Sequence, residues 1–112
     1  MSIEKKHIII SGKMATGKTH IAEAIALTHK ESSVLRIDSK NLIKKLHKGK
    51  EYKVFKNINL AIIEECSLTD IVFTKQSLTS DFDLTAVFLT LNSVPNDFKE
   101  DFHIINPNNY HL

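Results

Sequence analysis

The sequence predicts an α/β protein, a three-layer sandwich with a mostly parallel sheet of about five strands, because of the order of its apolar segments and its length. Short apolar runs typical of buried strands alternate with stretches of helical periodicity. Such alternation calls for parallel pairing, with helices against the sheet. The chain has 112 residues, 42% of them hydrophobic. It is below the size at which chains divide, so we expect one minimal domain, residues 1–112.

The first two strands are expected at residues 7–10 and 34–37, with a helix between them. Residues 7–10 read His-Ile-Ile-Ile, a β-branched run typical of a strand that is buried on both faces. The helix begins near Lys18 and has an apolar face at Ile21 and Ile25, among alanines. The order is therefore strand, loop, helix, strand.

A lysine-rich helix is expected next, over residues 40–47. Ser39 is expected to be its N-cap, and Gly49 suits the residue that ends it. Residues 50–59 have no clear period. The apolar stripe of this helix consists of Leu42, Ile43 and Leu46.

Three further strands are expected, at residues 60–63, 84–91 and 103–105. Residues 67–83 fit either one helix or two short pieces, and both interpretations stay open. A short helical turn is expected at residues 97–101. With these elements the chain has five strands, all in a strand–helix alternation.

A glycine-lysine motif lies between the first expected strand and helix. It reads Gly12-Lys13-Met14-Ala15-Thr16-Gly17-Lys18-Thr19 and satisfies the pattern G-x-x-x-x-G-K-[ST]. Gly12 and Gly17 lack a Cβ, so the loop can take positive φ and point its N–H groups into one concavity. The helix N-terminus and Lys18 add positive charge. The motif, with His20 directly after it, therefore predicts a binding site for nucleotide phosphates; the alternative is a glycine turn before an ordinary helix.

Polar residues follow the third and fourth expected strands, and they are candidates for the chemistry at this site. Since the carboxyl ends of parallel strands meet at one edge, Glu64, Glu65 and Asn92 are expected beside the glycine motif. Thr19 would ligate Mg²⁺ directly, and Glu64 would hold it through a water. Glu65 would act as general base toward an attacking water, and Asn92 would contact the γ-phosphate or position that water. The alternative for the two glutamates is a pair of solvated carboxylates.

This order of motifs resembles the P-loop NTPases of the AAA+ and superfamily 3 helicase kind, over His7 to about Ile105. The resemblance implies that the chain binds ATP with Mg²⁺ and acts as an ATPase, a nucleoside triphosphate hydrolase. It implies that Lys18, Glu65 and Asn92 are catalytic and that Thr19 and Glu64 serve the metal ion. In that family Asn92 would sense the γ-phosphate.

The sequence departs from the family pattern in four ways. Ala15 stands where many family loops have a further glycine, and Glu64 stands where aspartate is commoner. Arg36 is the only arginine, whereas residues 99–102, near the last strand, read Lys-Glu-Asp-Phe. The family's C-terminal helical lid has no counterpart in these residues. Because an arginine contributes about 10³ to 10⁵ in rate to GTPases that use one, we expect weak intrinsic hydrolysis. A homo-oligomer or another partner would supply the missing arginine.

Charge is unevenly distributed along the chain. Residues 1–56 carry 13 basic and 5 acidic groups, and residues 57–112 carry 2 and 8, which gives +8 against −6. The basic excess can track a nucleic-acid backbone or face the acidic half of another copy. It can equally be the solvated face of an amphipathic helix. The lysines expected to meet nucleic acid are Lys40, Lys44, Lys45 and Lys48.

Other classes are excluded or left as alternatives. Cys66 is the only cysteine, so no intrachain disulfide or cysteine zinc cluster can form, and we expect it to be buried or half-buried. No apolar run approaches the roughly 18 residues of a membrane span, so we expect a cytoplasmic protein without a membrane partner. Two other functions remain alternatives: a small P-loop kinase for a nucleotide or metabolite, and a non-catalytic module that is switched by ATP.

Overall fold

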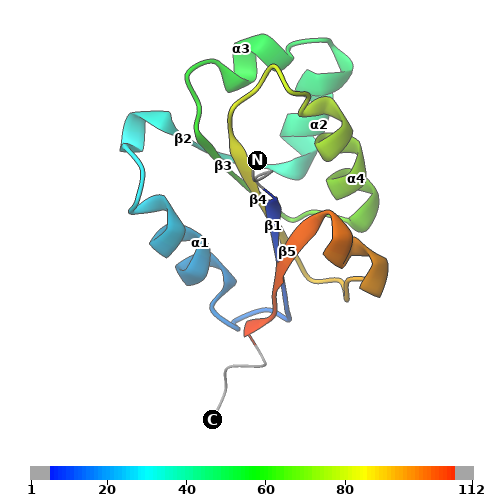
Figure 1. The fold of residues 1–112 in the computed structure, drawn as a ribbon. Helices are drawn as coiled ribbons and strands as arrows, with labels where there is room; N and C mark the ends of the chain where they lie inside the picture. Colours follow the sequence, from blue (N-terminus) through cyan, green and yellow to red (C-terminus); the bar gives the residue numbers. More distant parts are fainter. Residues whose placement is uncertain (1–5, 108–112) are drawn as a thin grey trace, which may run out of the picture.

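The computed structural model describes residues 6–107, which form an α/β fold around one sheet (Figure 1). The five strands of this sheet are all parallel and lie in the order β2-β3-β4-β1-β5. Their bounds are β1 (His7–Ser11), β2 (Val34–Asp38), β3 (Leu60–Glu64), β4 (Thr85–Thr90) and β5 (Phe102–Ile105). Each lies where the sequence predicts a strand, so the α/β class and the parallel sheet are confirmed.

Helices cover both faces of the sheet. Their bounds are α1 (Lys18–Ala26), α2 (Ser39–His47), α3 (Glu51–Phe55) and α4 (Leu68–Ser77), with 3₁₀ turns η1 (Glu31–Ser33) and η2 (Asn96–Glu100). In Figure 1, α1 lies on one side of the sheet, and α2 and α4 lie on the other. The arrangement is therefore compatible with the expected three layers.

Each strand face contributes to a separate core, because successive side chains of a strand point to opposite faces. Ile9 and Phe88 pack in one buried cluster with Leu42 of α2 and Ile71 of α4. Residues that point to the opposite face of the sheet form a second cluster. It packs against Ala22 and Ala26 of α1 and contains Ile10, Leu60, Ile62, Val87 and Leu89. Burial on both faces is the reason that these strands are apolar at nearly every position.

The helix boundaries correct the sequence-based expectations at α2. Asp38, rather than Ser39, caps this helix, since its carboxylate accepts from the Asn41 N–H at 2.9 Å. Ser39 is buried and donates its hydroxyl to Asp70 Oδ2 at 3.0 Å. Gly49 ends the helix as predicted, with φ of 69° and its N–H bonded to the Leu46 carbonyl. A tertiary partner for Ser39 thus displaced it from the cap.

The sequence patterns did not predict helix α3 and left two alternatives for helix α4. Helix α3 occupies part of residues 50–59, where no period is visible. Helix α4 settles the open segment 67–83 as one helix, which begins with a capping box in which Ser67 and Asp70 bond to each other's backbone N–H. This pairing satisfies two N–H groups at the start of α4.

The chain leaves the neighbouring strands β1 and β4 in opposite directions across the sheet. From β1 it passes through α1 to the edge strand β2, and from β4 it passes through η2 to the other edge strand, β5. In open parallel sheets a crevice forms beyond the carboxyl ends of strands at such a point. Within residues 6–107 no helix has the length and apolar composition that crossing a bilayer requires.

Candidate functional site

A pocket of about 540 Å³ opens beyond the carboxyl ends of β1, β3 and β4. Its volume lies in the usual range for small-molecule sites, about 300 to 1,000 Å³. Residues of three distant segments line it: Met14, Lys18, Thr19, Glu64, Glu65, Cys66, Ser67, Leu89, Thr90, Leu91 and Asn92. The topology therefore gathers the glycine motif, the acidic pair and Asn92 around one cavity.

The loop between β1 and α1 takes positive φ at two positions. Gly17 has φ of 89°, and a Cβ built on it meets no atom within 4 Å. Ala15 has φ of 62°, a conformation that costs an L-residue roughly 1–2 kcal/mol. Gly12 does not have positive φ, contrary to the expectation from sequence; a Cβ there would lie 2.9 Å from Thr16 Oγ1. A side chain at position 12 would force Thr16 Oγ1 to move, whereas glycine suits position 17 because of its conformation.

Lys18 folds back onto the loop that it follows. Its Nζ donates to the Gly12 carbonyl at 2.6 Å and to the Lys13 carbonyl at 2.7 Å. Thr16 Oγ1 donates to the same Lys13 carbonyl at 2.7 Å. Partial burial lowers the pKa of the Lys18 ammonium. These bonds hold a cation at the base of the pocket, beside the N-terminus of α1.

The acidic pair lies at the turn that follows β3. Glu64 is the last residue of the strand, and Glu65 has φ of 57°, so the chain bends sharply between them. Cys66 then returns to the sheet, where its N–H bonds to the Leu89 carbonyl at 3.0 Å. Both carboxylates are solvent-exposed, which leaves the interpretation as solvated carboxylates open. Positive φ at a non-glycine residue is strained, and such residues cluster at functional sites.

Cys66 is buried, as the sequence predicts. Its thiol donates to the Ile63 carbonyl at 3.3 Å. Burial raises the pKa of this thiol to about 12. Because the thiolate is the reactive form, Cys66 has the environment of a structural residue rather than of a nucleophile.

Asn92 is held through its backbone. Its N–H bonds to Thr90 Oγ1 at 3.1 Å, and its carbonyl accepts from Ser11 Oγ at 2.6 Å. The Gly12 N–H bonds to the Thr90 carbonyl at 3.1 Å, which ties the start of the loop to the end of β4. The segment that carries Asn92 and the loop of the glycine motif are thus joined directly.

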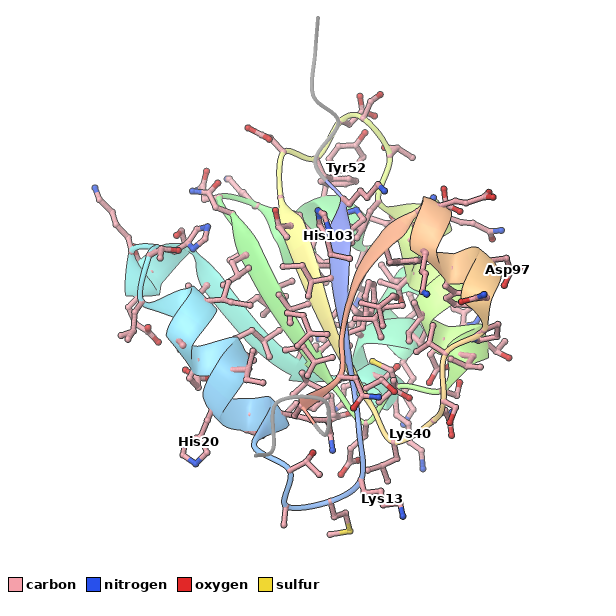
Figure 2. The ribbon with its side chains drawn as sticks, turned by 60° about the horizontal axis from the view of Figure 1, so that its bottom comes forward. Lys13, His20, Lys40, Tyr52, Asp97 and His103 are labelled. Carbon is pink, nitrogen blue, oxygen red and sulfur yellow. The ribbon has the colours of Figure 1, made fainter. Side chains whose placement is uncertain are left out.

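The structure brings together most, but not all, of the predicted site residues. Met14, Lys18, Thr19, Glu64, Glu65 and Asn92 line one pocket, whereas Gly12, Lys13, Ala15, Thr16 and Gly17 shape the loop at its edge. His20 lies exposed on α1 and points away from the protein body, and Lys13 lies exposed on the loop (Figure 2).

Several pocket residues were not predicted from the sequence. Ser67, Leu89, Thr90 and Leu91 line the pocket, and Ser11 anchors Asn92 beneath it. Ser11, Leu89, Thr90 and Leu91 lie at or next to the carboxyl end of a strand, and Ser67 caps the helix that follows β3. Their position at this edge of the sheet is the signal that would have included them. Leu91 and Met14 are 61% and 79% exposed, so the pocket has an apolar rim.

Arg36 forms ion pairs outside the pocket. Its guanidinium makes two hydrogen bonds to Glu23, at 2.8 and 2.7 Å, and also pairs with Glu31. These bonds raise the pKa of Arg36 and lower that of Glu23. Arg36 does not line the pocket, so Lys18 is the only cationic side chain among its lining residues.

The lysine-rich segment forms an exposed surface. Leu42 and Leu46 of α2 are buried, so this helix is amphipathic. On its outer side and along the following residues, seven lysines are exposed: Lys40, Lys44, Lys45, Lys48, Lys50, Lys53 and Lys56.

Few side chains at this site could serve as metal ligands. Within residues 6–107 no group of three His, Cys, Asp or Glu side chains could hold a metal ion. Thr19 and Glu64 face one pocket, and such a sparse donor set suits Mg²⁺, which retains waters and takes phosphate oxygens. Comparison with known proteins adds no family: no family model matches the chain, and no curated protein matches it.

Proposed function

We propose that this chain binds ATP with Mg²⁺ as a P-loop NTPase and hydrolyses it slowly. The observation that carries the proposal is the shared pocket, in which Lys18 and Thr19 meet Glu64, Glu65 and Asn92. A cation at a helix N-terminus suits phosphate, while carboxylates that line the same pocket suit a metal ion and a water. These two kinds of group are useful together when a charged phosphate must be both bound and attacked.

Each residue has a separate role in this proposal. Lys18 exchanges its two loop carbonyls for phosphate oxygens, and the N–H groups from Lys13 to Thr19 bind the same phosphates. Thr19 and Glu64 hold Mg²⁺, which would neutralise charge on the phosphates. Glu65 accepts the proton of the attacking water, and Asn92 contacts the γ-phosphate.

The rate of hydrolysis is expected to be low. Arg36 is paired with Glu23 and Glu31, and no other arginine exists in the chain. Lys99 lies exposed on η2 and does not line the pocket. A partner, either another copy or a different protein, would have to supply a second cation for fast turnover.

Thermal unfolding and phosphate release test the proposal. Saturating MgATP, at about 100 times its Kd, should add about 2.7 kcal/mol to the free energy of unfolding. Glu65→Gln should bind MgATP like the wild type but release phosphate about 10²- to 10⁴-fold more slowly. Glu100→Gln, on the exposed turn η2, is the matched control and should change neither.

The outcomes separate the alternatives. An unchanged melting temperature with saturating nucleotide would eliminate all versions of the proposal. Phosphate that appears on an acceptor rather than in water would indicate the kinase. Nucleotide binding without any phosphate release, even with partner present, would indicate the switch module.

We also propose a second function, nucleic-acid binding, for the exposed lysine surface of α2 and the residues after it. The supporting observation is that all seven of its lysines, from Lys40 to Lys56, are exposed. Binding to single-stranded DNA should weaken steeply as salt rises, because each neutralised phosphate releases about 0.7 counterions. Replacing Lys44, Lys45 and Lys48 together by Gln should flatten that dependence. If the three substitutions leave the salt dependence of DNA affinity unchanged, these lysines do not bind DNA. They would then form only the solvated face of an amphipathic helix.

A further inference from the structure

We propose that Ser11 is a positioning residue that couples the phosphate-binding loop to Asn92. The inference rests on the proposed function, because it concerns how the site distinguishes ATP from ADP. Its basis is the hydrogen bond of 2.6 Å from Ser11 Oγ to the Asn92 carbonyl. Ser11 is the last residue of β1 and directly precedes Gly12, where the loop begins.

The backbone of Asn92 is fixed from both sides. Ser11 donates to its carbonyl, and Thr90 Oγ1 accepts from its N–H at 3.1 Å. Both hydroxyls are buried, with Ser11 6% and Thr90 1% exposed. A buried polar group without a hydrogen-bond partner is costly. The two hydroxyls therefore fix the backbone of Asn92, and with it the Cα from which its side chain extends.

The same residues also hold the loop. Ser11 pairs with Thr90 in the β1–β4 ladder, and the Gly12 N–H bonds to the Thr90 carbonyl at 3.1 Å. The loop and the Asn92 segment therefore share one set of anchors at the point where the chain leaves β1 and β4 in opposite directions. A shift of the loop on phosphate binding would be passed to Asn92 through Ser11.

Leu91 separates the two anchored positions. It lies between Thr90 and Asn92, is 61% exposed and lines the pocket. The chain thus bends outward at Leu91 and returns to Ser11 at Asn92. Of the two bonds, only the one from Ser11 holds the Asn92 carbonyl. Without the Ser11 hydroxyl, the bond between the Asn92 N–H and Thr90 would remain, and the carbonyl would lose its restraint.

The test compares affinities for MgATP and MgADP, measured by calorimetry on wild type, Asn92→Ala, Ser11→Ala and the double variant. Asn92→Ala should reduce the preference for ATP over ADP about tenfold, the size of one charge-assisted hydrogen bond. Ser11→Ala should reduce the preference about fivefold and leave ADP affinity unchanged. The double variant should behave like Asn92→Ala alone, because the two residues act through one contact.

Ser33→Ala is the matched control. Ser33 is a buried serine that also donates to a backbone carbonyl, that of Lys30 at 2.8 Å, away from the pocket. The Ser33→Ala variant should lose about as much free energy of unfolding as Ser11→Ala and should keep the wild-type preference for ATP. Thr90→Val, which removes the acceptor for the Asn92 N–H, is a second route to the same result if Ser11→Ala does not fold.

The outcomes distinguish this inference from the proposed function. If the wild type binds neither nucleotide, the proposed function fails. If the wild type prefers ATP and a folded Ser11→Ala keeps that preference, the coupling through Ser11 is wrong while nucleotide binding stands; if Ser11→Ala does not fold, an unchanged preference in Thr90→Val overturns it instead. Additive losses in the double variant would also overturn it, since they would place Ser11 outside the Asn92 contact.

Discussion

The Lys18 ammonium lies 2.6 Å from the carbonyl oxygen of Gly12, the residue that opens the same loop. An ammonium has three N–H donors, and the Gly12 and Lys13 carbonyls take two of them, so a ligand with several acceptors would compete with the loop for Lys18. The loop is therefore held together by the side chain that is proposed to recognise the ligand. In the proposed function, nucleotide binding would exchange carbonyl acceptors for charged oxygens, which accept hydrogen bonds more strongly.

Lys18→Ala should remove about half or more of the stabilisation by MgATP at about 100 times the wild-type Kd. Loss of a charged hydrogen-bond donor costs about 1.5–3 kcal/mol, which corresponds to an affinity roughly 10- to 150-fold lower. Titration calorimetry measures the change directly. Lys13→Ala is the control, because the exposed Lys13 side chain is not among the residues that line the pocket. Equal losses in both variants would show that only overall charge matters.

Ala15→Gly and Gly17→Ala should change stability in opposite directions. Both positions have positive φ, 62° and 89°, and a Cβ at Gly17 would meet no neighbour. The effect is then conformational alone: Gly17→Ala should cost about 1–2 kcal/mol, and Ala15→Gly should be neutral or stabilise by up to about 1 kcal/mol. Urea unfolding midpoints check both. A destabilised Ala15→Gly would contradict the left-handed conformation at this position.

His7 should make the protein less stable in mild acid. Its Nδ1 accepts from the Ala86 N–H at 2.9 Å, so this nitrogen must be unprotonated. Burial, with a smaller contribution from Lys75, lowers the pKa of His7 below 6.5 in the folded state. The unfolded chain then binds the proton first, so the free energy of unfolding is fully retained above about pH 6.5 and falls as the pH drops below it.

Unfolding titrations between about pH 8 and pH 5 test this dependence. His7→Asn keeps a hydrogen-bond acceptor without the titration and should flatten the curve. His103→Asn, at an exposed position of the neighbouring strand, is the control and should leave the slope as in the wild type. Equal slopes for His7→Asn and the wild type would assign the acid sensitivity to other groups.

Cys66 should resist thiol reagents while the protein is folded. Its pKa is raised to about 12 by burial, so almost no thiolate exists near neutral pH. Labelling with a disulfide reagent at about pH 8 should proceed only through unfolding, whereas the urea-unfolded chain should react at once. Rapid labelling of the native protein would show that the turn after Glu65 opens without global unfolding.

The sequence was most informative where one physical requirement determined the residue type. Strands buried on both faces must be apolar throughout, so runs such as the one ending at Ile10 could be recognised directly. The glycine at position 17 has a conformation that few other residues adopt. Positive φ was therefore expected correctly at Gly17, whereas it occurs at Ala15 and not at Gly12 elsewhere in the loop.

Features that depend on distant contacts could not be predicted. The hydroxyl of Ser39 bonds to Asp70 on another helix, so Asp38 became the cap of α2. Helix α3 has only five residues, too few to display a period. The bond from Ser11 to Asn92 joins residues 81 positions apart, and neither residue type alone indicates it. The capping box of Ser67 and Asp70 is an exception, since its spacing is readable in the sequence.

The position of β4 between β1 and β3 sets the width of the pocket. Neighbouring strands lie about 4.8 Å apart, so the ends of β1 and β3 are separated by roughly 9.5 Å. Lys18 lies beyond the first of these strands and Glu64 ends the other, so the ammonium and the carboxylate reach the pocket from opposite sides of β4. The intervening strand thus spaces the origins of two opposite charges around one cavity, and the proposed phosphate, cation and water would lie between them.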